Sequence, residues 1–225
     1  KLNRSIKASI DQDVYKLSVK DNRLYGVPWF IGIQTLYYNK TMFEEAGLTS
    51  PPETMEQLKD YAIKLAKYDN NGNLIRSGLS LRLSGSGSGI AHKWAPFLIA
   101  FGGDILVETP GGKYHNGYDN EAGRNALKFY IDLVHKYNAD NLMVKHDSEA
   151  FALQNTAMFY REAWVIGYMN THAPKVNYNT APVPGQVKRG TTIISCNFYV
   201  PTTSKNTEEA WSFLEHLLQE KYAKS

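Results

Sequence analysis

The sequence has 225 residues, 43% hydrophobic and 21% charged, values typical of a folded protein rather than a disordered one. Its net charge of +3 comes from 25 basic residues scattered among 22 acidic ones, so no basic stripe indicates a nucleic-acid partner. The single cysteine, Cys196, excludes an internal disulfide, and no spacing of cysteine and histidine matches a zinc site. No segment approaches the roughly 20 apolar residues of a membrane span. We therefore expect a soluble protein without nucleic acid, metal or other cofactor.

The first half of the chain alternates expected strands and helices. Residues 24–39 are rich in aromatic and β-branched residues, which predicts strands broken by a bend at glycine and proline. A capping box that begins at Thr54, followed by apolar residues at helical spacing, predicts a helix over 54–67. The segment 69–73 lacks the glycine and glutamate positions of a calcium loop and predicts a hairpin turn instead. Residues 78–84 indicate a strand, and residues 90–101 indicate a helix.

The second half continues the alternation. Residues 102–115 resemble a hairpin, and residues 120–138 repeat apolar side chains, including Leu127 and Ile131, with a helical period. Residues 191–206 read as a long β segment. The last helix is expected to open with Asn206 as its cap and to bury Trp211. Interleaved strands and helices predict an α/β protein with helices packed on a mixed sheet.

Residues 84–89 alternate serine and glycine, the composition of a flexible linker. Ile90 stands where a dinucleotide-binding motif needs its last glycine, and no Gly-Lys-Ser/Thr of a phosphate-binding loop follows. The phase of the alternation is also wrong for a nucleophile elbow. Two interpretations stay open: a surface loop, native or engineered, and the wall of a binding site whose backbone N–H groups approach a ligand.

Aromatic residues are abundant, with four tryptophans and fifteen tyrosines. Aromatic faces stack on sugar rings, although most aromatic side chains simply belong to a core. Trp29, Trp94 and Trp164 each lie beside a bend or the start of an element, where binding residues gather. The best case for an enzyme is a glycosidase that uses Asp104 and Glu162, whose separation the sequence does not reveal. The six histidines are dispersed and form no metal-hydrolase pattern, so we expect no catalytic activity.

Several segments taken in order resemble the extracellular solute-binding proteins of sugar-transporting ABC importers, the family that includes maltose-binding protein. The segments are LYGVPWFIGIQTLYYNKTMFEEAGLTSPPETMEQLKDYAIKLAK, FLIAFGGDIL, NEAGRNALKFYIDLV, NTAMFYREAWVIGYM, NTAPVPG and VPTTSKNTEEAWSFLEHLL. No single segment is diagnostic, but together they cover most of the chain in register.

The resemblance implies a periplasmic-binding-protein-like fold of class II, in which two α/β lobes close about a hinge and enclose a ligand. Residues 1–31 are then a remnant of the first lobe with one hinge crossing, and residues 32–190 the second, ligand-binding lobe. Residues 191–225 are the return crossing and a helix of the first lobe. Most of the first lobe is expected to be missing before Lys1, and the final helices after Ser225.

The same resemblance implies the site residues. Trp164 falls on the family's cleft aromatic, and together with Trp94 it is expected to stack on a sugar ring. Arg161 and Glu162 precede it, where relatives often carry small residues, and are expected to bind hydroxyl groups. The other candidates share an expected place beside the cleft: Ser84, Gly85, Ser86, His92, Asp104, Trp29 and Asn197.

The implied function is that of the substrate-binding component of an ABC importer, which captures a sugar or oligosaccharide and delivers it to a membrane permease. The protein is implied to be a monomer that is located outside the cell or in the periplasm. The resemblance also allows a lipid anchor to the cell membrane at an N-terminal segment that is expected to be missing here. Three alternatives stay open: a carbohydrate-active enzyme, a binding protein for a non-sugar solute, and an interaction module. Because ligand contacts are expected from both lobes, we expect weak or no binding by this chain alone.

Overall fold

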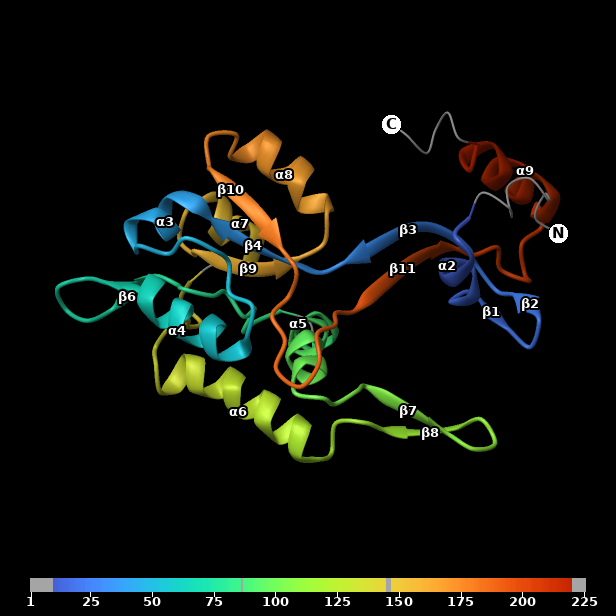
Figure 1. The fold of residues 1–225 in the computed structure, drawn as a ribbon. Coiled ribbons are helices and arrows are strands. Elements are labelled where there is room, and N and C mark those ends of the chain that lie inside the picture. The colour runs from blue at the N-terminus through green and yellow to red at the C-terminus, as the bar shows by residue number, and fades with distance from the viewer. Residues whose placement is uncertain (1–9, 86, 145–146, 220–225) are drawn as a thin grey trace. The chain divides into compact units, whose positions relative to one another are not determined.

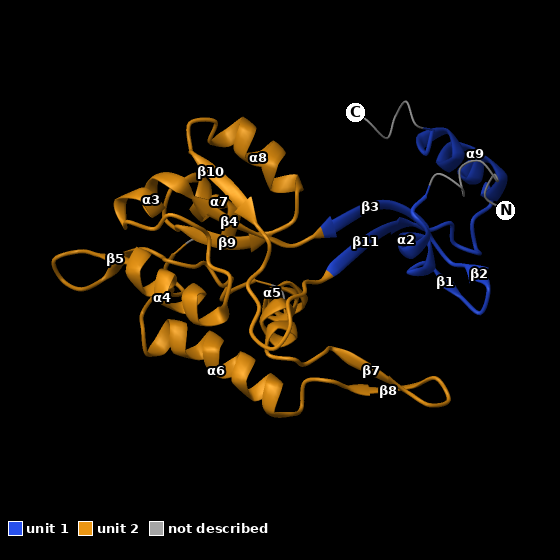
Figure 2. Ribbon diagram, in the orientation of Figure 1, with its two compact units in different colours: residues 1–32, 193–225 blue, residues 33–192 orange. Residues whose placement is uncertain are grey.

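The computed structural model describes residues 10–85, 87–144 and 147–219 of the chain (Figure 1). The chain divides into two compact units, with residues 1–32 and 193–225 in unit 1 and residues 33–192 in unit 2 (Figure 2). Among the described residues, no helix combines the length and the apolar character that a membrane crossing requires.

Unit 2 is built on a three-stranded antiparallel sheet with the strand order β10–β4–β9. These strands are β4 (Thr35–Asn39), β9 (Met158–Arg161) and β10 (Tyr178–Ala181). In the central strand, Tyr37 lies opposite Thr180 on one side and Phe159 on the other. The neighbouring strands thus come from parts of the chain more than a hundred residues apart, which brings the end of β9 close to the beginning of β4.

The two faces of this sheet carry two separate apolar clusters, because successive side chains of a strand point to opposite faces. Leu36 and Tyr160 belong to the larger cluster, and Tyr37 and Phe159 to the smaller one. The helices that pack into the larger cluster are α3 (Lys40–Glu45), α4 (Met55–Leu65), α5 (Gly87–Ala100) and α6 (Glu121–His135). Those of the smaller cluster are α7 (Asp147–Ala152) and α8 (Trp164–His172). The sheet is therefore covered on both faces, as in an α/β architecture (Figure 1).

Helix α4 confirms the prediction from its cap. The Gln57 backbone N–H donates to Thr54 Oγ1 at 3.1 Å, and the helix buries the expected apolar stripe. It ends at Leu65, two residues before the predicted end, because the chain passes into β5 (Lys67–Tyr68). The predicted turn at 69–73 is confirmed as the connection from β5 to β6 (Leu74–Arg76).

The strand predicted over 78–84 is wrong. Only isolated parallel bridges form here, from Ser77 to Thr156 and from Ser80 to Phe159. Two residues explain the interruption. The backbone of Gly78 is packed so closely on that of Ala62 that a Cβ would lie 1.8 Å from the Ala62 carbonyl oxygen. Arg82 has a φ of +54°, which no regular strand allows.

The helix predicted over 120–138 is α6, but its buried face matches only in part the expected stripe of Leu127, Tyr130, Ile131, Val134 and Tyr137. Ala126, Tyr130 and Leu133 are buried, whereas Leu127 and Ile131 are exposed. The buried residues lie four and three positions apart, so they form one narrow stripe of the helix, and Leu127 and Ile131 lie beside it. The hairpin expected within 102–115 is confirmed as β7 (Leu106–Thr109) and β8 (Lys113–Asn116), which pair with each other.

Unit 1 consists of short elements around the two-stranded sheet of β3 (Val27–Ile33) and β11 (Ile193–Phe198). The others are α2 (Gln12–Lys16), β1 (Val19–Lys20), β2 (Arg23–Leu24) and α9 (Thr207–Leu217). Asn206 precedes α9 as predicted, but its side chain makes no cap hydrogen bond, which corrects that expectation. Trp211 is half-buried, and Leu214 is the buried residue of the helix.

Candidate functional site

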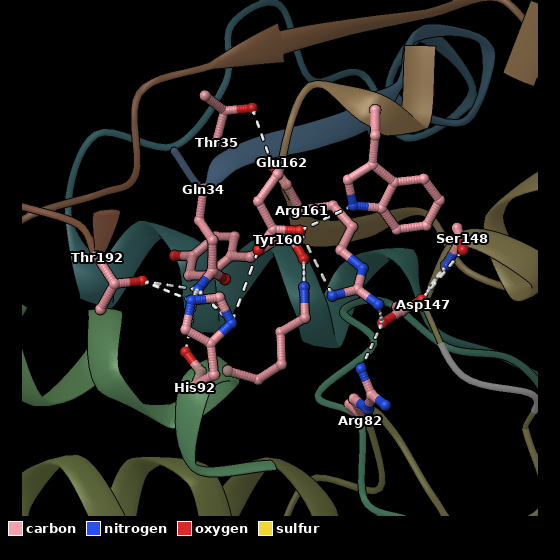
Figure 3. A network of polar contacts seen from close by, with 12 residues as sticks. Gln34, Thr35, Arg82, His92, Asp147, Ser148, Tyr160, Arg161, Glu162 and Thr192 are labelled. Atoms are coloured by element: carbon pink, nitrogen blue, oxygen red, sulfur yellow. Dashed lines mark hydrogen bonds and ion pairs between the residues drawn. The ribbon is translucent and has the colours of Figure 1, made fainter. Parts of the chain in front are cut away.

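Polar and charged side chains gather in unit 2 around the end of β9 and the beginnings of α5 and α8 (Figure 3). We call them the polar cluster. Its members are Gln34, Arg82, His92, Lys93, Asp147, Arg161, Glu162, Trp164 and Thr192. They come from several separate stretches of the chain, so only folding brings them together.

Trp164 is the exposed member of the polar cluster, with 43% of its surface accessible. It lies at the first position of α8, three residues after the last residue of β9. Its indole N–H donates to Glu162 Oε2 at 3.1 Å, and the Arg161 guanidinium lies 5.1 Å from the centre of its ring. An aromatic face and a polar edge are thus presented together at the surface of unit 2.

The Glu162 carboxylate is buried and faces groups from two other residues besides Trp164. Arg161 Nη1 lies 3.5 Å from Oε2, and His92 Nδ1 lies 3.7 Å from Oε1. Burial lowers the pKa of His92 below its ordinary value, while the Glu162 carboxylate opposes that shift. Within the described part of the chain, Oε1 is buried and has no hydrogen-bond partner.

Gln34 connects the first and the last residues of unit 2 to α5 by hydrogen bonds. Its Nε2 lies 2.9 Å from Thr192 Oγ1 and donates to the His92 carbonyl at 3.0 Å. Thr191 Oγ1 donates in turn to the Gln34 carbonyl at 3.1 Å. Gln34 and Thr192 lie at the two boundaries of unit 2, so both passages of the chain between the units are anchored beside the polar cluster.

Asp147 links two arginines at the other end of the polar cluster. Its Oδ2 lies 3.2 Å from Arg161 Nη2 and 3.9 Å from Arg82 Nη1, and its backbone N–H donates to Ser80 Oγ. Arg82 and Asp147 both have a positive φ, of +54° and +34°, which is uncommon for residues other than glycine. Such conformations persist where surrounding contacts hold them, and they gather at functional sites.

The serine–glycine run surrounds Arg82. Gly85 has a φ of +106°, and a Cβ on Gly89 would lie 2.9 Å from Arg82 Cζ, so a larger residue would meet the guanidinium. Helix α5 begins at Gly87, so the second half of the run is the first turn of a helix and not a loop. Ser84 and Gly85 are exposed, and Ser86 lies outside the described residues. Gly89 therefore has a packing role whether or not a ligand contacts it.

Lys93 is a buried member of the polar cluster, and its side-chain nitrogen donates to the Tyr160 carbonyl. Burial lowers the pKa of Lys93 to about 7, and the charge of Arg161 adds to this effect. Asp147 and Glu162 oppose the shift. Arg161, Arg82, Asp147 and Glu162 together carry equal numbers of positive and negative charges, so a neutral Lys93 leaves this part of the cluster balanced.

The other predicted residues lie apart from these contacts. Trp94 is half-buried against the larger apolar cluster and meets Tyr118 edge to face at 6.4 Å. Asp104 is exposed before the β7–β8 hairpin, where its carboxylate accepts from the Ile105 N–H at 2.8 Å. Among the described contacts, none joins Asp104 to the polar cluster or to Glu162, its expected partner in a glycosidase.

Trp29 and Asn197 belong to unit 1 and to its sheet of β3 and β11. The Trp29 ring packs on Phe198 with 5.2 Å between the ring centres. Asn197 Oδ1 accepts from Ser18 Oγ at 2.9 Å and from Ser195 Oγ at 3.0 Å. Their ligand role stays a prediction.

Sequence reasoning did not single out several members of the polar cluster. These are Gln34, Arg82, Lys93, Asp147 and Thr192. A glutamine inside an aromatic and aliphatic strand segment, as at Gln34, is the kind of signal that could have drawn attention. Across the residues that the structure describes, no group of three or more histidine, cysteine, aspartate or glutamate side chains could hold a metal ion.

Comparison with known families gives a match along nearly the whole chain. The profile of the family described as bacterial extracellular solute-binding protein matches residues 2–224. The mannitol-binding protein of Pseudomonas aeruginosa is 25% identical over 92% of this chain and 48% of its own length. The diacetylchitobiose binding protein DasA of Streptomyces coelicolor is 23% identical over 98% of this chain and 51% of its own length. The chain thus spans about half the length of the curated relatives that it matches.

Solved structures show the same architecture. An ABC transporter solute-binding protein from Thermotoga lettingae, bound with α-D-tagatose, has a TM-score of 0.80 and 28% identity. The match covers 98% of this chain and 56% of that one. Maltose-bound MalE3 of T. maritima has a TM-score of 0.81 at 22% identity, over 96% of this chain and 56% of that one. The fold is therefore that of the periplasmic-binding-protein class, as the sequence pattern implied.

Proposed function

We propose that this chain, which belongs to the family of bacterial extracellular solute-binding proteins, contributes one wall of a binding site for a sugar or a sugar oligomer. In this proposal, unit 2 is the ligand-binding lobe, and unit 1 carries the hinge crossings and a helix of the other lobe. The relatives that bind mannitol, diacetylchitobiose and tagatose support the ligand class.

The observation that carries the proposal is the geometry at Trp164. Its ring is partly open to solvent, and its N–H is held by a buried carboxylate. An aromatic face offers apolar contact to the C–H side of a sugar ring, while polar groups beside it bind the hydroxyls. The carboxylate of Glu162, whose buried Oε1 has no hydrogen-bond partner among the described residues, and the donors of Arg161 lie within the same cluster. A polyhydroxylated ring needs this combination of one apolar face and several polar partners.

The proposed mechanism is capture without chemistry. A ligand that contacts both lobes favours the closed form by its difference in affinity for the two conformations. Gln34 and Thr192, which anchor the two chain passages, also contact His92 in the polar cluster. The closed complex would then deliver the sugar to a membrane permease. A location outside the cell, a lipid anchor and a monomeric state complete the proposal, with Ser84, Gly85, His92, Trp94, Trp29, Asn197 and Asp104 as further candidate contacts.

Saturation-transfer NMR on the 225-residue chain tests this proposal. The probes are maltose, D-tagatose and D-mannitol, each titrated into the tens of millimolar, because a single wall is expected to bind with a Kd of about a millimolar or weaker. We expect saturation transfer to ring C–H protons of at least one probe. Trp164→Ala should abolish the signal, and Phe213→Ala, which removes an exposed aromatic ring on α9, should leave it unchanged. Absence of transfer with every probe, or transfer that survives in Trp164→Ala, would overturn the proposal.

A further inference from the structure

Trp164 is exposed, yet three contacts restrict its ring, one of which is an edge-on contact with the Tyr168 ring at 6.3 Å between ring centres. Its N–H donates to Glu162 at 3.1 Å, and the Arg161 guanidinium lies over the ring at 5.1 Å from its centre. The helix that begins at Trp164 supplies no additional side-chain cap, because the cap position holds Ala163. An exposed aromatic side chain without such contacts exchanges between rotamers. Tyr168 lies on the same helix as Trp164, so the contacts that tie the ring to the residues before the helix are those with Glu162 and Arg161.

We propose that Glu162 and Arg161 are positioning residues, which fix the plane of Trp164 and leave one of its two ring faces open to a ligand. The inference deepens the proposed function and rests on it, because Trp164 is there the residue that stacks on the sugar. It adds a specificity rule: a sugar ring stacks on the face opposite Arg161.

Arg161 is suited to this role because its own guanidinium is fixed on two sides. Nη2 lies 3.2 Å from Asp147 Oδ2, and Nη1 lies 3.5 Å from Glu162 Oε2. Two carboxylates around a planar guanidinium define its plane, which leaves the flat face to lie against the indole. Arg82 Nη1 lies 3.9 Å from the same Asp147 oxygen, so Asp147 is held between two guanidinium groups. A lysine, with a single point of charge, could not cover the ring in the same way.

The consequence is a binding surface that is ordered before a ligand arrives. Ordering an aromatic side chain on binding costs affinity, and prior ordering removes that cost. The guanidinium over one face also excludes a ligand from that face. The open face meets the apolar side of one sugar ring, while the hydroxyls at its rim can reach the polar edge of the cluster.

A simpler role for Glu162 is to neutralise the partly buried Arg161, and the two roles make different demands. Neutralisation needs the negative charge of the carboxylate. Positioning needs an oxygen that accepts from the indole N–H, and a glutamine supplies one without charge. Glu162→Gln and Glu162→Leu therefore separate the two roles, because only the first keeps an acceptor at similar length.

The test uses the chain with Trp164 as its single tryptophan, made by Trp29→Phe, Trp94→Phe and Trp211→Phe, without any sugar. Acrylamide quenching measures how open the ring is, and fluorescence anisotropy decay measures its motion. In Glu162→Leu we expect the amplitude of fast indole motion to rise about twofold, whereas Glu162→Gln should retain the parent value. In Arg161→Ala we expect the quenching constant to rise about twofold, because both ring faces become accessible.

The matched control is Arg124→Ala at an exposed position of α6, which should leave both signals unchanged. Far-UV circular dichroism checks folding; if Arg161→Ala loses helix signal, Arg161→Lys replaces it, with a smaller expected rise in quenching. Equal effects of Glu162→Gln and Glu162→Leu, or parent-like quenching in the folded Arg161 variant, would overturn the inference. Since no sugar is present, such a failure leaves sugar binding standing. Conversely, if no sugar binds in the titration, the quenching and anisotropy measurements still test whether Glu162 and Arg161 position the ring.

Discussion

The two units differ most in how much apolar surface they bury. Unit 2 encloses one apolar cluster on each face of its sheet, and Tyr37 and Phe159 in the smaller cluster are almost wholly buried. Among the described residues of unit 1, Val27, Pro28 and Leu214 are the buried apolar side chains. Large side chains of unit 1 such as Trp29 and Phe213 remain exposed.

The difference follows from strand pairing. A sheet of three strands with helices on both faces buries side chains on both faces of its central strand, as β4 shows with Leu36 and Tyr37. The strands that the structure describes in unit 1 pair only in twos, and a two-stranded sheet is marginal in water by itself. We therefore expect unit 2 to supply most of the free energy of folding of this chain and unit 1 to open first.

The largest expected effect is a decrease in the free energy of unfolding when the buried aromatic ring of Phe159 in unit 2 is removed. Phe159 contacts Tyr37 and Phe151 at ring-centre distances of 5.1 and 4.7 Å. Phe159→Ala should lower the free energy of unfolding by about 3–5 kcal/mol, through lost transfer energy and the cavity left behind. Urea unfolding monitored by far-UV circular dichroism measures the change.

Phe213→Ala in unit 1 is the matched comparison. Its ring is 60% exposed, so the free energy of unfolding should change by less than about 0.5 kcal/mol. A loss comparable to that of Phe159→Ala would show that unit 1 has a core of its own, and the contrast between the units would fail.

The elements of unit 2 differ in how far local sequence predicts them. Helix α4 follows from Thr54 and its apolar stripe, because cap and period are local properties. The strand expected over 78–84 does not form, since the close approach of Gly78 to Ala62 is set by packing between distant segments. The buried stripe of α6 was likewise misplaced. Apolar period alone does not distinguish Leu127 from Leu133 when both fit a helical repeat.

The candidate site shows the same division. Arg161, Glu162 and Trp164 are neighbours along the chain and could be named together by resemblance to a family. Arg82 and Asp147 are 65 residues apart, and only the packing of the segments beside β9 places their charges within 3.9 Å. Pairings of this kind have no local signature, so reasoning from one sequence could not predict them.

We expect a smaller effect on the free energy of unfolding from replacing Lys93, a buried lysine in the well-packed unit 2. Burial lowers the pKa of Lys93 from 10.5 to about 7, so the folded state favours the neutral amine. Above pH 10.5 Lys93 is neutral in the folded and the unfolded chain, so it causes no loss of stability there. As the pH falls from 10.5 towards 7, the unfolded chain binds a proton at Lys93 before the folded one does, and the free energy of unfolding decreases. Lys93→Met should be more stable than the parent by about 1–3 kcal/mol at pH 6, with the difference shrinking towards pH 10.

Urea unfolding at pH 6, 8 and 10 measures this trend, with Lys64→Met as the control. Lys64 is exposed on α4, so its replacement should give no difference that changes over this range. A Lys93→Met variant that is less stable at pH 6 than at pH 10, relative to the parent, would contradict the sign. It would mean that the ammonium group gains more from Asp147 and Glu162 than it loses through burial.

The smallest expected effect is in the serine–glycine run, a part of unit 2 whose described residues are mostly exposed, like many residues of unit 1. A Cβ on Gly87 would meet no atom within 4 Å, and Gly87 is the first residue of α5. Gly87→Ala should therefore raise the free energy of unfolding by about 0.5 kcal/mol, because alanine loses less conformational freedom in a helix. Gly89→Ala should instead destabilise, since its Cβ would lie 2.9 Å from the Arg82 guanidinium, which Asp147 holds in place. Thermal unfolding of the two variants measures the difference. Equal effects of both substitutions would show that the run acts as a linker with no packing role around Arg82.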